Sequence, residues 1–476
     1  MNQQQCEIGI IGLGVMGQNL LLNIAEKNRL VVGLDQDPRK ARAINNPNVH
    51  IAKSLHDFIH QLKIPRIVML MVPAGKPVDD VISELHPFLM ENDIIIDAGN
   101  SHYKDTDRRL IELAAKGVHL LGVGISGGEA GARFGSSIMP GGDRLAYEHV
   151  ANIFNDIAAK VDRNPCVAYL GAGSAGHYVK MVHNGIEYGL MQLLSESYGL
   201  MKYGLGLSND ELHDIYNDWN QGKWESFLLE ITANIFKQAD HKSDGRLIDK
   251  ILDESKQKGT GKWTSESALE LQLPTPTINI AVAMRDLSSQ REERVNFARK
   301  YPAPSSASAP APMLKEWSRP QFVSKIRDTL YFCTIITYAQ GMALLKKASL
   351  TFHYDLPLKT VSTIWQGGCI IRSALLKDIS AAFEQNPKLC NLLLDSNISQ
   401  KIFQLEMPTR EVVAASISSA IPIPAIANSL LYFDAYRSLQ PTANLIQAQR
   451  DYFGAHTYER IDEPQKKFHT QWEHSQ

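Results

Sequence analysis

The sequence predicts an α/β Rossmann N-terminal domain followed by a large all-α domain with an internal duplication and an extended C-terminal tail. Two observations predict this fold class. Short apolar runs alternate with helical patterns as far as residue 170, and a glycine-rich turn joins the first run to the first helix. From residue 206 onward, almost every segment has helical periodicity. We therefore expect domains at 1–176, 177–440 and 441–476.

Length and composition are those of a multidomain globular protein. A chain of 476 residues is too long for one core, and 44% hydrophobic with 21% charged residues is typical of globular proteins. The net charge of −2 gives no long-range attraction for nucleic acid, so local basic residues must bind any anion. No apolar stretch is long enough to span a membrane. We expect neither a nucleic-acid nor a membrane partner.

The cysteines indicate a cytoplasmic location and no bound metal. They are odd in number and scattered, and none belongs to a Cys-x-x-Cys pair, which argues against a disulfide framework or a zinc site. The N-terminus lacks a basic region followed by an apolar run, so we expect no signal peptide. The cysteines are Cys6, Cys166, Cys333, Cys369 and Cys390.

A glycine-rich turn after the first apolar run has the dinucleotide-binding pattern. Gly12 allows a tight turn, Gly14 lets the backbone approach a pyrophosphate, and Gly17 lets the next helix pack closely. A second apolar run leads into Asp35, about twenty residues further on, as the Rossmann pattern requires. We expect cofactor contacts from Gly12, Leu13, Gly14, Val15, Met16, Gly17, Asp35, Gln36 and Asp37.

Two further apolar runs, at 66–72 and 93–97, are predicted to be buried parallel strands. Both runs end at residues that favour turns. Ligands of such sheets bind at the carboxyl ends of the strands. We therefore expect more cofactor contacts at these two ends, from Val72, Pro73, Ala74 and Asn100.

Glycine-dense segments follow at 121–133 and 139–142. Such segments can be simple turns. Beside a Rossmann core, however, with Ser126 in front of paired glycines, their N–H groups suit a carboxylate or hydroxyl groups. Residues 167–170 are predicted to form a last strand before the turn at 171–173, which releases a long helix.

That long helix carries a candidate reactive set. At 3.6 residues per turn, Lys180, Asn184 and Glu187 fall nearly on one line, with Tyr188 beside it. A base, an amide and an acid would then share one face at the junction of two domains. The alternative is a solvated helix face with a stabilising ion pair. Geometry alone leaves catalysis and a structural role equally open.

Longer motifs resemble those of the decarboxylating 6-phosphogluconate dehydrogenases. The match runs through essentially the whole chain, and the longer strings are too specific to arise by chance. The motifs are Gly-Val-Met-Gly-Gln-Asn at 14–19, Gly-Asn-Ser at 99–101, Ser-Gly-Gly-Glu at 126–129, Met-Pro-Gly-Gly at 139–142, Lys-Met-Val-His-Asn-Gly-Ile-Glu-Tyr at 180–188, Gln-Lys-Gly-Thr-Gly-Lys-Trp at 257–263, and the strings at 365–372 and 447–456.

The resemblance implies oxidative decarboxylation of 6-phospho-D-gluconate to D-ribulose 5-phosphate and carbon dioxide, with reduction of NAD or NADP, in the pentose phosphate pathway. It implies that Lys180 is the general base and Glu187 the general acid. A lysine can act as a base only if its pKa falls from about 10.4 toward about 7–8, through burial or a nearby positive charge.

The resemblance also implies the substrate contacts and a homodimer whose tail completes the partner's active site. The contacts to the sugar-acid end would come from Asn100, Ser126, Gly127, Gly128, His183 and Asn184. The contacts to the phosphate would come from Tyr188, Lys258, Thr260 and Arg285, together with Arg450 and His456 of the partner subunit.

The chain departs from the family at the end of the second predicted strand. It has Asp-Gln-Asp at 35–37, where the usual NADP-dependent enzymes have Asn-Arg-Thr. A carboxylate about 4 Å from a 2′-phosphate would cost on the order of 4 kcal/mol at an effective dielectric constant of about 20, so Asp35 favours NAD. Arg39 and Lys40 follow closely and leave NADP open. Other departures, expected to tune coenzyme contacts, are Pro73, Ala98 and Gln366 in place of lysine, glycine and arginine.

The helical half repeats a pattern. Trp-Asn-Gln-Gly at 219–222 precedes Ser226, and Trp-Gln-Gly-Gly at 365–368 precedes Ser373, which predicts a duplicated helical unit. Both tryptophans could be core residues, so we assign them no catalytic role. The Pro-, Ala- and Ser-rich residues 301–312 are predicted to form an exposed loop.

Two other functions remain open at this point. A related dehydrogenase of a different 3-hydroxy acid would not need the implied phosphate contacts, and their joint presence argues against it. A non-catalytic relative would not need an intact Lys180 and Glu187.

Overall fold

The computed structural model describes residues 5–42, 44–302 and 317–472. Most of the predicted loop at 301–312 lies outside these residues. By its contacts the chain divides into two units, Met1–Ser429 and Leu430–Gln476. The finer division into three domains stays a prediction. In the part of the chain that the structure describes, no helix is long and apolar enough to cross a bilayer.

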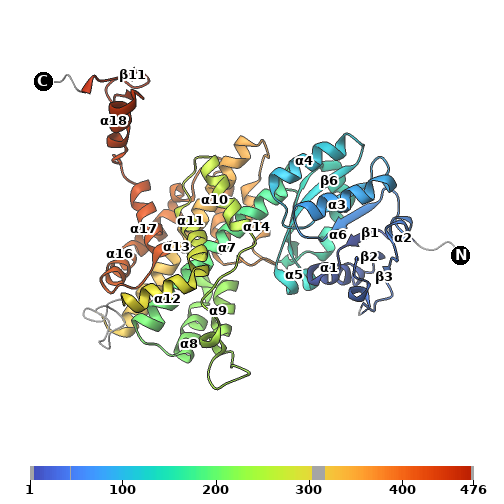
Figure 1. Cartoon of the computed structure of the whole chain (residues 1–476), viewed down its shortest axis with the longest axis horizontal. Helices are drawn as coiled ribbons and strands as arrows, with labels where there is room; N and C mark the ends of the chain where they lie inside the picture. The colour runs from blue at the N-terminus through green and yellow to red at the C-terminus, as the bar shows by residue number, and fades with distance from the viewer. Residues whose placement is uncertain (1–4, 43, 303–316, 473–476) are drawn as a thin grey trace. The chain divides into compact units, whose positions relative to one another are not determined.

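The N-terminal part of the first unit is a seven-stranded sheet with strand order β3-β2-β1-β4-β5-β6-β7. Its strand pairs are parallel except for β6 with β7, which is antiparallel. The predicted Rossmann architecture is thereby confirmed (Figure 1). The strands are β1 Ile8–Ile11, β2 Val31–Leu34, β3 Val49–Ile51, β4 Ile67–Leu70, β5 Ile94–Asp97, β6 His119–Ser126 and β7 Ser137–Gly142.

Helices cover both faces of this sheet, because β-strands buried on two sides need apolar partners on each. One core cluster packs Leu20 and Ile153 against one face, and a second packs Phe58 and Leu113 against the other. The helices of this part are α1 Val15–Ala25, α2 Leu55–His60, α3 Lys76–Leu85, α4 Tyr103–Ala114, α5 Gly128–Phe134 and α6 Arg144–Ile157.

Three predictions for this part were wrong. Residues 121–126, in the first of the two glycine-dense segments, belong to strand β6. Residues 139–142, predicted as a glycine-rich loop, belong to strand β7 and pair with β6. The glycines there permit close packing, since a Cβ on Gly141 would lie 2.3 Å from the Gly176 nitrogen. Residues 167–170, predicted as a strand, form only an isolated bridge between Val167 and Ile138.

Helix α7, Ala175–Gly199, is the central element of the first unit. It contacts β6 and β7 of the sheet, and also α10 Thr260–Glu270, α11 Pro276–Ser289 and α13 Arg319–Thr351 (Figure 1). Glycines on α7 permit this close packing. A Cβ on Gly185, for example, would lie 2.5 Å from Thr264 Cγ2. The turn at 171–173 precedes this helix, as predicted.

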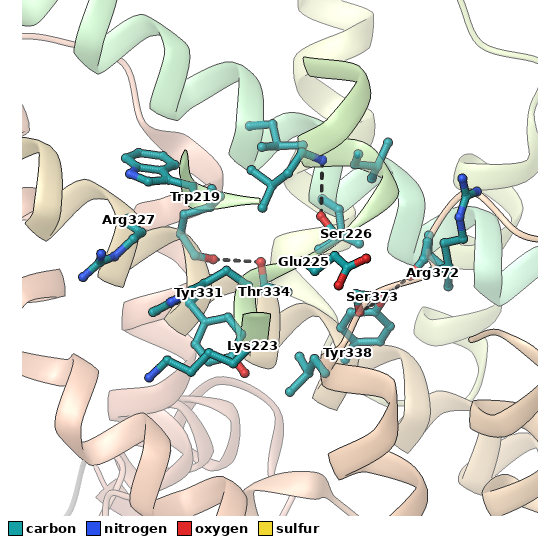
Figure 2. A pocket seen from close by; sticks show the side chains of 18 of the residues that line it. Trp219, Lys223, Glu225, Ser226, Arg327, Tyr331, Thr334, Tyr338, Arg372 and Ser373 are labelled. Carbon is teal, nitrogen blue, oxygen red and sulfur yellow. Dashed lines mark hydrogen bonds between the residues drawn. The ribbon is translucent and has the colours of Figure 1, made fainter. Parts of the chain in front are cut away.

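The remaining helices include the duplicated segments. Ser226 and Ser373 form an antiparallel bridge, so the two matching sequences face each other (Figure 2). Trp219 and Trp365 are both buried, as core residues would be. These helices are α8 Asn209–Trp219, α9 Phe227–Lys237, α12 Arg291–Lys300, α14 Leu358–Ile364, α15 Leu375–Gln385, α16 Ser396–Ser418 and α17 Pro424–Tyr436.

The second unit contains the last part of α17 and the tail, with α18 Ala443–Gly454, β10 Tyr458–Glu459 and β11 Lys467–Phe468. The buried carboxylate of Asp451 organises it. It accepts hydrogen bonds from the backbone nitrogens of Thr457 and Thr470, at 2.9 and 3.0 Å, and from Trp472 Nε1 at 2.9 Å. Desolvation would raise the pKa of Asp451, but these bonds and the one to His469 lower it to about 2.

Candidate active site

Lys180 lies on α7 where the helix crosses strand β6. Its side chain is buried, and Nζ donates a hydrogen bond to Asn184 Oδ1 at 2.6 Å. Gly124 of β6 makes room for it, since a Cβ on that glycine would lie 2.3 Å from the Lys180 Cβ. Desolvation lowers the pKa of Lys180, although Glu187 and Cys369 oppose the shift. Burial therefore favours the neutral amine that a general base requires.

His183 lies one turn further along α7 and is fully buried. Its Nε2 is 3.1 Å from Ser126 Oγ, and its Nδ1 is 3.1 Å from Asn184 Oδ1. Desolvation, together with the charge of Lys180, holds the pKa of His183 well below its usual value. Because Asn184 Oδ1 can only accept, a neutral His183 carries its proton on Nδ1 and accepts from Ser126 at Nε2.

Glu187 follows on the same face of the helix. One carboxylate oxygen is 3.8 Å from His183 Nδ1, and the side chain remains 21% exposed, so it can meet a ligand. Desolvation raises the pKa of Glu187, although the charges of Lys180 and Arg285 oppose this. A carboxyl group with a raised pKa can hold a proton closer to neutral pH and act as a general acid.

Tyr188, the next residue, connects this set to Arg285. The Arg285 guanidinium lies 3.4 Å from the centre of the Tyr188 ring, a cation–π contact. Gly261 also packs closely on Tyr188, since a Cβ there would lie 2.3 Å from Tyr188 Cδ2. Desolvation lowers the pKa of Arg285, while Tyr188 and Glu187 oppose the shift. The structure thus brings Arg285 beside the helix that carries Lys180 and Glu187.

The segment around Thr260 joins a loop to a helix. Gly259 has a left-handed conformation and ends the loop, and Thr260 begins helix α10. Thr260 is buried, whereas Lys258, two residues before it, is exposed. A helix N-terminus offers free N–H groups and a positive dipole end, both of which favour phosphate. The predicted contacts Lys258 and Thr260 therefore lie at a place suited to an anion.

The glycine-rich turn after β1 has the geometry that a dinucleotide requires. Gly12 has a φ of +99°, and a Cβ added to Gly14 would meet no atom within 4 Å. Helix α1 begins at Val15 without a side-chain cap, so its N-terminal N–H groups are available to a pyrophosphate. The predicted contacts Met16 and Gly17 lie on the first turns of this helix.

Asp35 follows strand β2 and holds the glycine-rich turn. It accepts hydrogen bonds from the backbone nitrogens of Leu13 at 2.7 Å and Asp37 at 2.8 Å. Lys40 Nζ lies 3.1 Å from Asp35, and Arg39 pairs with Asp37 at 2.9 Å. Desolvation raises the pKa of Asp35, but the hydrogen bonds from Asp37, Leu13 and Lys40 outweigh it, so the pKa is lowered. Both cations predicted to leave NADP open are thus already paired with carboxylates.

Other predicted contacts occupy the ends of neighbouring strands. Val72, Pro73 and Ala74 follow β4, and Asn100 follows β5 with its side chain exposed. Gln36 is also exposed beside Asp35. All of these residues lie at carboxyl ends of strands in the sheet, the edge at which ligands of such folds bind.

Ser126, Gly127 and Gly128 lie where β6 ends and α5 begins. Gly127 has a φ of +120° and Gly128 a φ of +62°, conformations that glycine adopts readily. A Cβ on Gly127 would lie 2.5 Å from the Gly368 carbonyl oxygen, so the loop containing Gly368 closes over this turn. The backbone nitrogen of Ile370 also approaches Ser126 Oγ at 3.4 Å.

Sequence reasoning missed several residues of the site. Gly124 provides the space for Lys180, and buried Cys369 is one of the two groups whose charge would raise the pKa of that lysine. Trp365 lies edge-on to His183, with ring centres 5.5 Å apart. The alternating glycines of Gly-Val-Gly at 122–124 signal a close backbone approach within a strand and could have indicated Gly124. No local pattern indicated Cys369.

Arg450 and His456 belong to the tail unit. Both are exposed, and Arg450 Nη1 donates to Gln447 Oε1 at 3.2 Å. His456 stacks edge-on to Phe453, with ring centres 5.9 Å apart. Their predicted contact with a substrate in the partner subunit stays a prediction.

A Rossmann edge beside a buried lysine, an amide and a carboxyl group defines a nicotinamide-dependent dehydrogenase with a helical second domain. Residues 7–171 match the family described as the NAD binding domain of 6-phosphogluconate dehydrogenase, and residues 176–472 match its C-terminal domain. The chain belongs to the 6-phosphogluconate dehydrogenase family.

Individual relatives agree with this assignment along their whole length. The decarboxylating 6-phosphogluconate dehydrogenase of Lactococcus lactis subsp. lactis is 47% identical over 474 residues, covering 98% of this chain and 99% of that protein. The NADP(+)-dependent decarboxylating enzyme of Bacillus subtilis is 46% identical, covering 99% of this chain and 100% of that protein. A solved structure of the Plasmodium falciparum enzyme has a TM-score of 0.93 at 42% identity, covering 98% and 100% of the two chains.

Proposed function

We propose that this chain oxidises and decarboxylates 6-phospho-D-gluconate, forming D-ribulose 5-phosphate and carbon dioxide in the pentose phosphate pathway. The observation that carries the proposal is the set of Lys180, Asn184 and Glu187, with opposite pKa shifts on the base and the acid, in a chain of this family. The relatives named above carry the same activity in their names. The nicotinamide ring of a bound coenzyme would accept the hydride from C3.

Lys180 acts first. Its neutral Nζ takes the proton of the C3 hydroxyl while the C3 hydride leaves, which gives a 3-keto acid. The ammonium group then donates a hydrogen bond to the keto oxygen and stabilises the negative charge that develops there as the C1–C2 bond breaks and carbon dioxide leaves. Asn184 supports both steps, because its amide oxygen accepts from Lys180 Nζ in either protonation state and so fixes the position of the nitrogen.

Glu187 completes the reaction. The Lys180 ammonium transfers its proton to the developing alkoxide, so loss of carbon dioxide leaves an enediol. The terminal carbon of the enediol then gains a proton to become C1 of the product, while the enediol hydroxyl returns its proton to Lys180 Nζ and becomes the keto group. The carboxyl group of Glu187 donates the proton that C1 gains, and its raised pKa supports that role. His183, neutral and bonded to Ser126, contributes a donor and an acceptor without adding a charge beside Lys180.

The two ends of the substrate meet different surroundings. The sugar-acid end lies against Ser126, Gly127, Gly128, Asn100, His183 and Asn184. The phosphate lies against Tyr188, Lys258, Thr260 and Arg285, with Arg450 and His456 supplied by the partner subunit of a homodimer. The N-terminus of α10 and the Arg285 guanidinium, which can form two parallel hydrogen bonds, support this orientation.

For the coenzyme we propose NAD in preference to NADP. Asp35 places a carboxylate beside the glycine-rich turn, where it can accept hydrogen bonds from free ribose hydroxyls. Lys40 and Arg39 are paired with Asp35 and Asp37, so neither cation is free to hold a 2′-phosphate. The Bacillus subtilis relative is NADP-dependent by name, and the Plasmodium falciparum enzyme was solved with NADP+, so this chain would differ from both.

The experiment that tests the activity is a product balance. Purified protein is given 6-phosphogluconate with either coenzyme, and reduced coenzyme, carbon dioxide and ribulose 5-phosphate are measured together. Equal amounts of the three are expected. Reduced coenzyme without carbon dioxide would indicate a simple hydroxy-acid dehydrogenase, and turnover of a non-phosphorylated 3-hydroxy acid in place of 6-phosphogluconate would overturn the assigned phosphate contacts.

A further inference from the structure

Arg109 is a buried arginine that the reaction above does not use. It lies on α4, Tyr103–Ala114, and only 1% of its side chain is exposed. Its guanidinium has three partners on two segments, the start of α3 and the end of β5. Nε donates to Asp79 Oδ1 at 2.7 Å, Nη1 to Asp97 Oδ2 at 3.2 Å, and Nη2 to the carbonyl oxygen of Gly75 at 2.9 Å.

Two of these partners flank turns at the coenzyme edge of the sheet: Gly75 ends the turn after β4, and Asp97 precedes the turn after β5. Gly75 has a φ of +85° and begins helix α3. Asp97 is the last residue of β5, and its carboxylate accepts from the backbone nitrogen of Gly99 at 3.2 Å and from Ser101 Oγ at 2.6 Å. Arg109 Nη1 also lies 3.4 Å from Ser101 Oγ.

The two loops are in contact with each other. A Cβ on Gly99 would lie 3.1 Å from the carbonyl oxygen of Val72, so the backbones of the two turns approach closely. One buried guanidinium therefore fixes both turns, which lie at the edge of the sheet where a coenzyme would bind. Arg109 itself is too deeply buried to touch that ligand and acts through Gly75 and Asp97.

The geometry requires an arginine and not merely a positive charge. A buried cation is expensive to desolvate unless it is fully paired, and here it is shared by two carboxylates and a carbonyl group. The planar guanidinium presents donors in three fixed directions, whereas a lysine ammonium is a single point of charge. A lysine could keep an ion pair with Asp97 or Asp79 but could not also hold Gly75.

We propose that Arg109 is a positioning residue for the coenzyme, which fixes the turns after β4 and β5 and thereby sets coenzyme affinity and the placement of the nicotinamide. Of the proposed substrate contacts, only Asn100 lies in a turn that Arg109 fixes. The others lie at the end of β6, on or beside α7, α10 and α11, and in the tail. Loss of its bridging bonds should therefore weaken coenzyme binding much more than substrate binding.

The test compares Arg109→Lys with Arg108→Lys in the full-length protein. Arg108 is a matched control, because it also donates to Asp79 Oδ1, at 2.9 Å, but its other partner is Glu112 and it reaches neither turn. The dissociation constants of NAD, NADP and 6-phosphogluconate are measured separately by calorimetry, with kcat and both KM values. Arg109→Lys is expected to raise the coenzyme Kd and KM at least tenfold, about 1.4 kcal/mol, with the 6-phosphogluconate Kd changed less than about threefold.

Arg108→Lys should leave all of these constants within about twofold. An unchanged coenzyme Kd in Arg109→Lys would overturn the proposal, and so would an equal loss of affinity for both ligands. If Arg109→Lys does not fold, Asp79→Asn provides the measurement. It removes one carboxylate from the cluster but keeps an acceptor, and a smaller rise in coenzyme Kd is expected, with the substrate Kd unchanged. A substrate Kd that rises as much as the coenzyme Kd in this variant would also overturn the proposal.

Discussion

Lys180 Nζ and Asn184 Oδ1 lie 2.6 Å apart, one turn from each other on a helix that is buried on several sides. The bond satisfies a buried amine without supplying a counter-charge. A carboxylate at this position would have kept the lysine protonated, because an opposite charge raises the pKa of an amine. An amide oxygen holds the nitrogen in place and leaves its pKa to be lowered by desolvation.

This relationship predicts that Lys180 cannot be replaced by either a neutral or a cationic side chain. Lys180→Met should lower kcat by about 10²–10⁴-fold, the usual contribution of a general base. Lys180→Arg should be equally inactive, because a guanidinium stays protonated. Coenzyme Kd should change little in either variant, which calorimetry would check. A Lys180→Met protein with more than a tenth of the normal kcat would exclude Lys180 as the base.

The raised pKa of Glu187 predicts how the rate falls on the alkaline side of the pH–rate profile. Its pKa is raised by desolvation, so the acid form persists to a higher pH than for an exposed glutamate and is lost as pH rises through the raised value. Glu187→Gln removes this proton donor. Product formation should fall about 10²-fold or more, and the alkaline limb assigned to Glu187 should disappear from the kcat profile. A Gln variant with an unchanged profile would assign that limb to another group.

How far the sequence predicts this structure depends on the range of the interactions concerned. The turn at Gly12–Gly17 and the line of Lys180, Asn184 and Glu187 follow from local spacing, so they were predictable. Strand β7 was not, because its glycines have the composition of a loop and their purpose, packing against Gly176, comes from a helix further along the chain.

The parts of the site that the sequence did not predict come from distant segments. Cys369 and Lys180 are far apart in the sequence, and so are Arg109 and Gly75, and no periodicity connects them. The pairing of Lys40 with Asp35 was also hidden, because the sequence showed two nearby cations but not that carboxylates already held them. The contacts of Cys369 and of Arg109 depend on tertiary packing, whereas the two ion pairs depend on how the turn after β2 folds.

Asp35 predicts the choice of coenzyme. The measured quantity is the ratio of kcat/KM with NAD to that with NADP at one ionic strength, which we expect to exceed one. Asp35→Asn should lower this ratio at least tenfold, because the variant removes a negative charge near a 2′-phosphate. The variant also weakens the bonds to Leu13 and Asp37, but this affects both coenzymes and cancels in the ratio. A wild-type preference for NADP would contradict the proposal.

Asp451 predicts how the tail responds to acid and to mutation. Because its pKa is lowered to about 2, the carboxylate stabilises the tail above the ordinary aspartate pKa near 3.8, and this stabilisation is lost as pH falls toward 2. Asp451→Asn should speed amide exchange across 441–472 and raise the KM for 6-phosphogluconate, if Arg450 and His456 complete the partner's site. Asp462→Asn, which affects only an exposed pair with Arg460, is the control. A normal KM with a loosened tail would contradict the shared site.

The close contact between Gly124 and Lys180 predicts that a larger side chain at position 124 lowers both stability and kcat. Gly124→Ala would place a Cβ 2.3 Å from the Lys180 Cβ and close to the Gly176 carbonyl oxygen at 3.1 Å, so α7 must move away from β6. Overpacking of this kind typically costs about 1–3 kcal/mol of stability, measurable by denaturant unfolding. Because the displaced residue is the base, kcat should fall even when the variant is assayed well below its Tm, where essentially all of the protein is folded. Gly199→Ala, at the end of α7 with no atom within 4 Å of the added Cβ, should leave kcat unchanged and should not lower the stability. If Gly124→Ala kept a normal kcat, the close contact between β6 and Lys180 would not be what positions the amine.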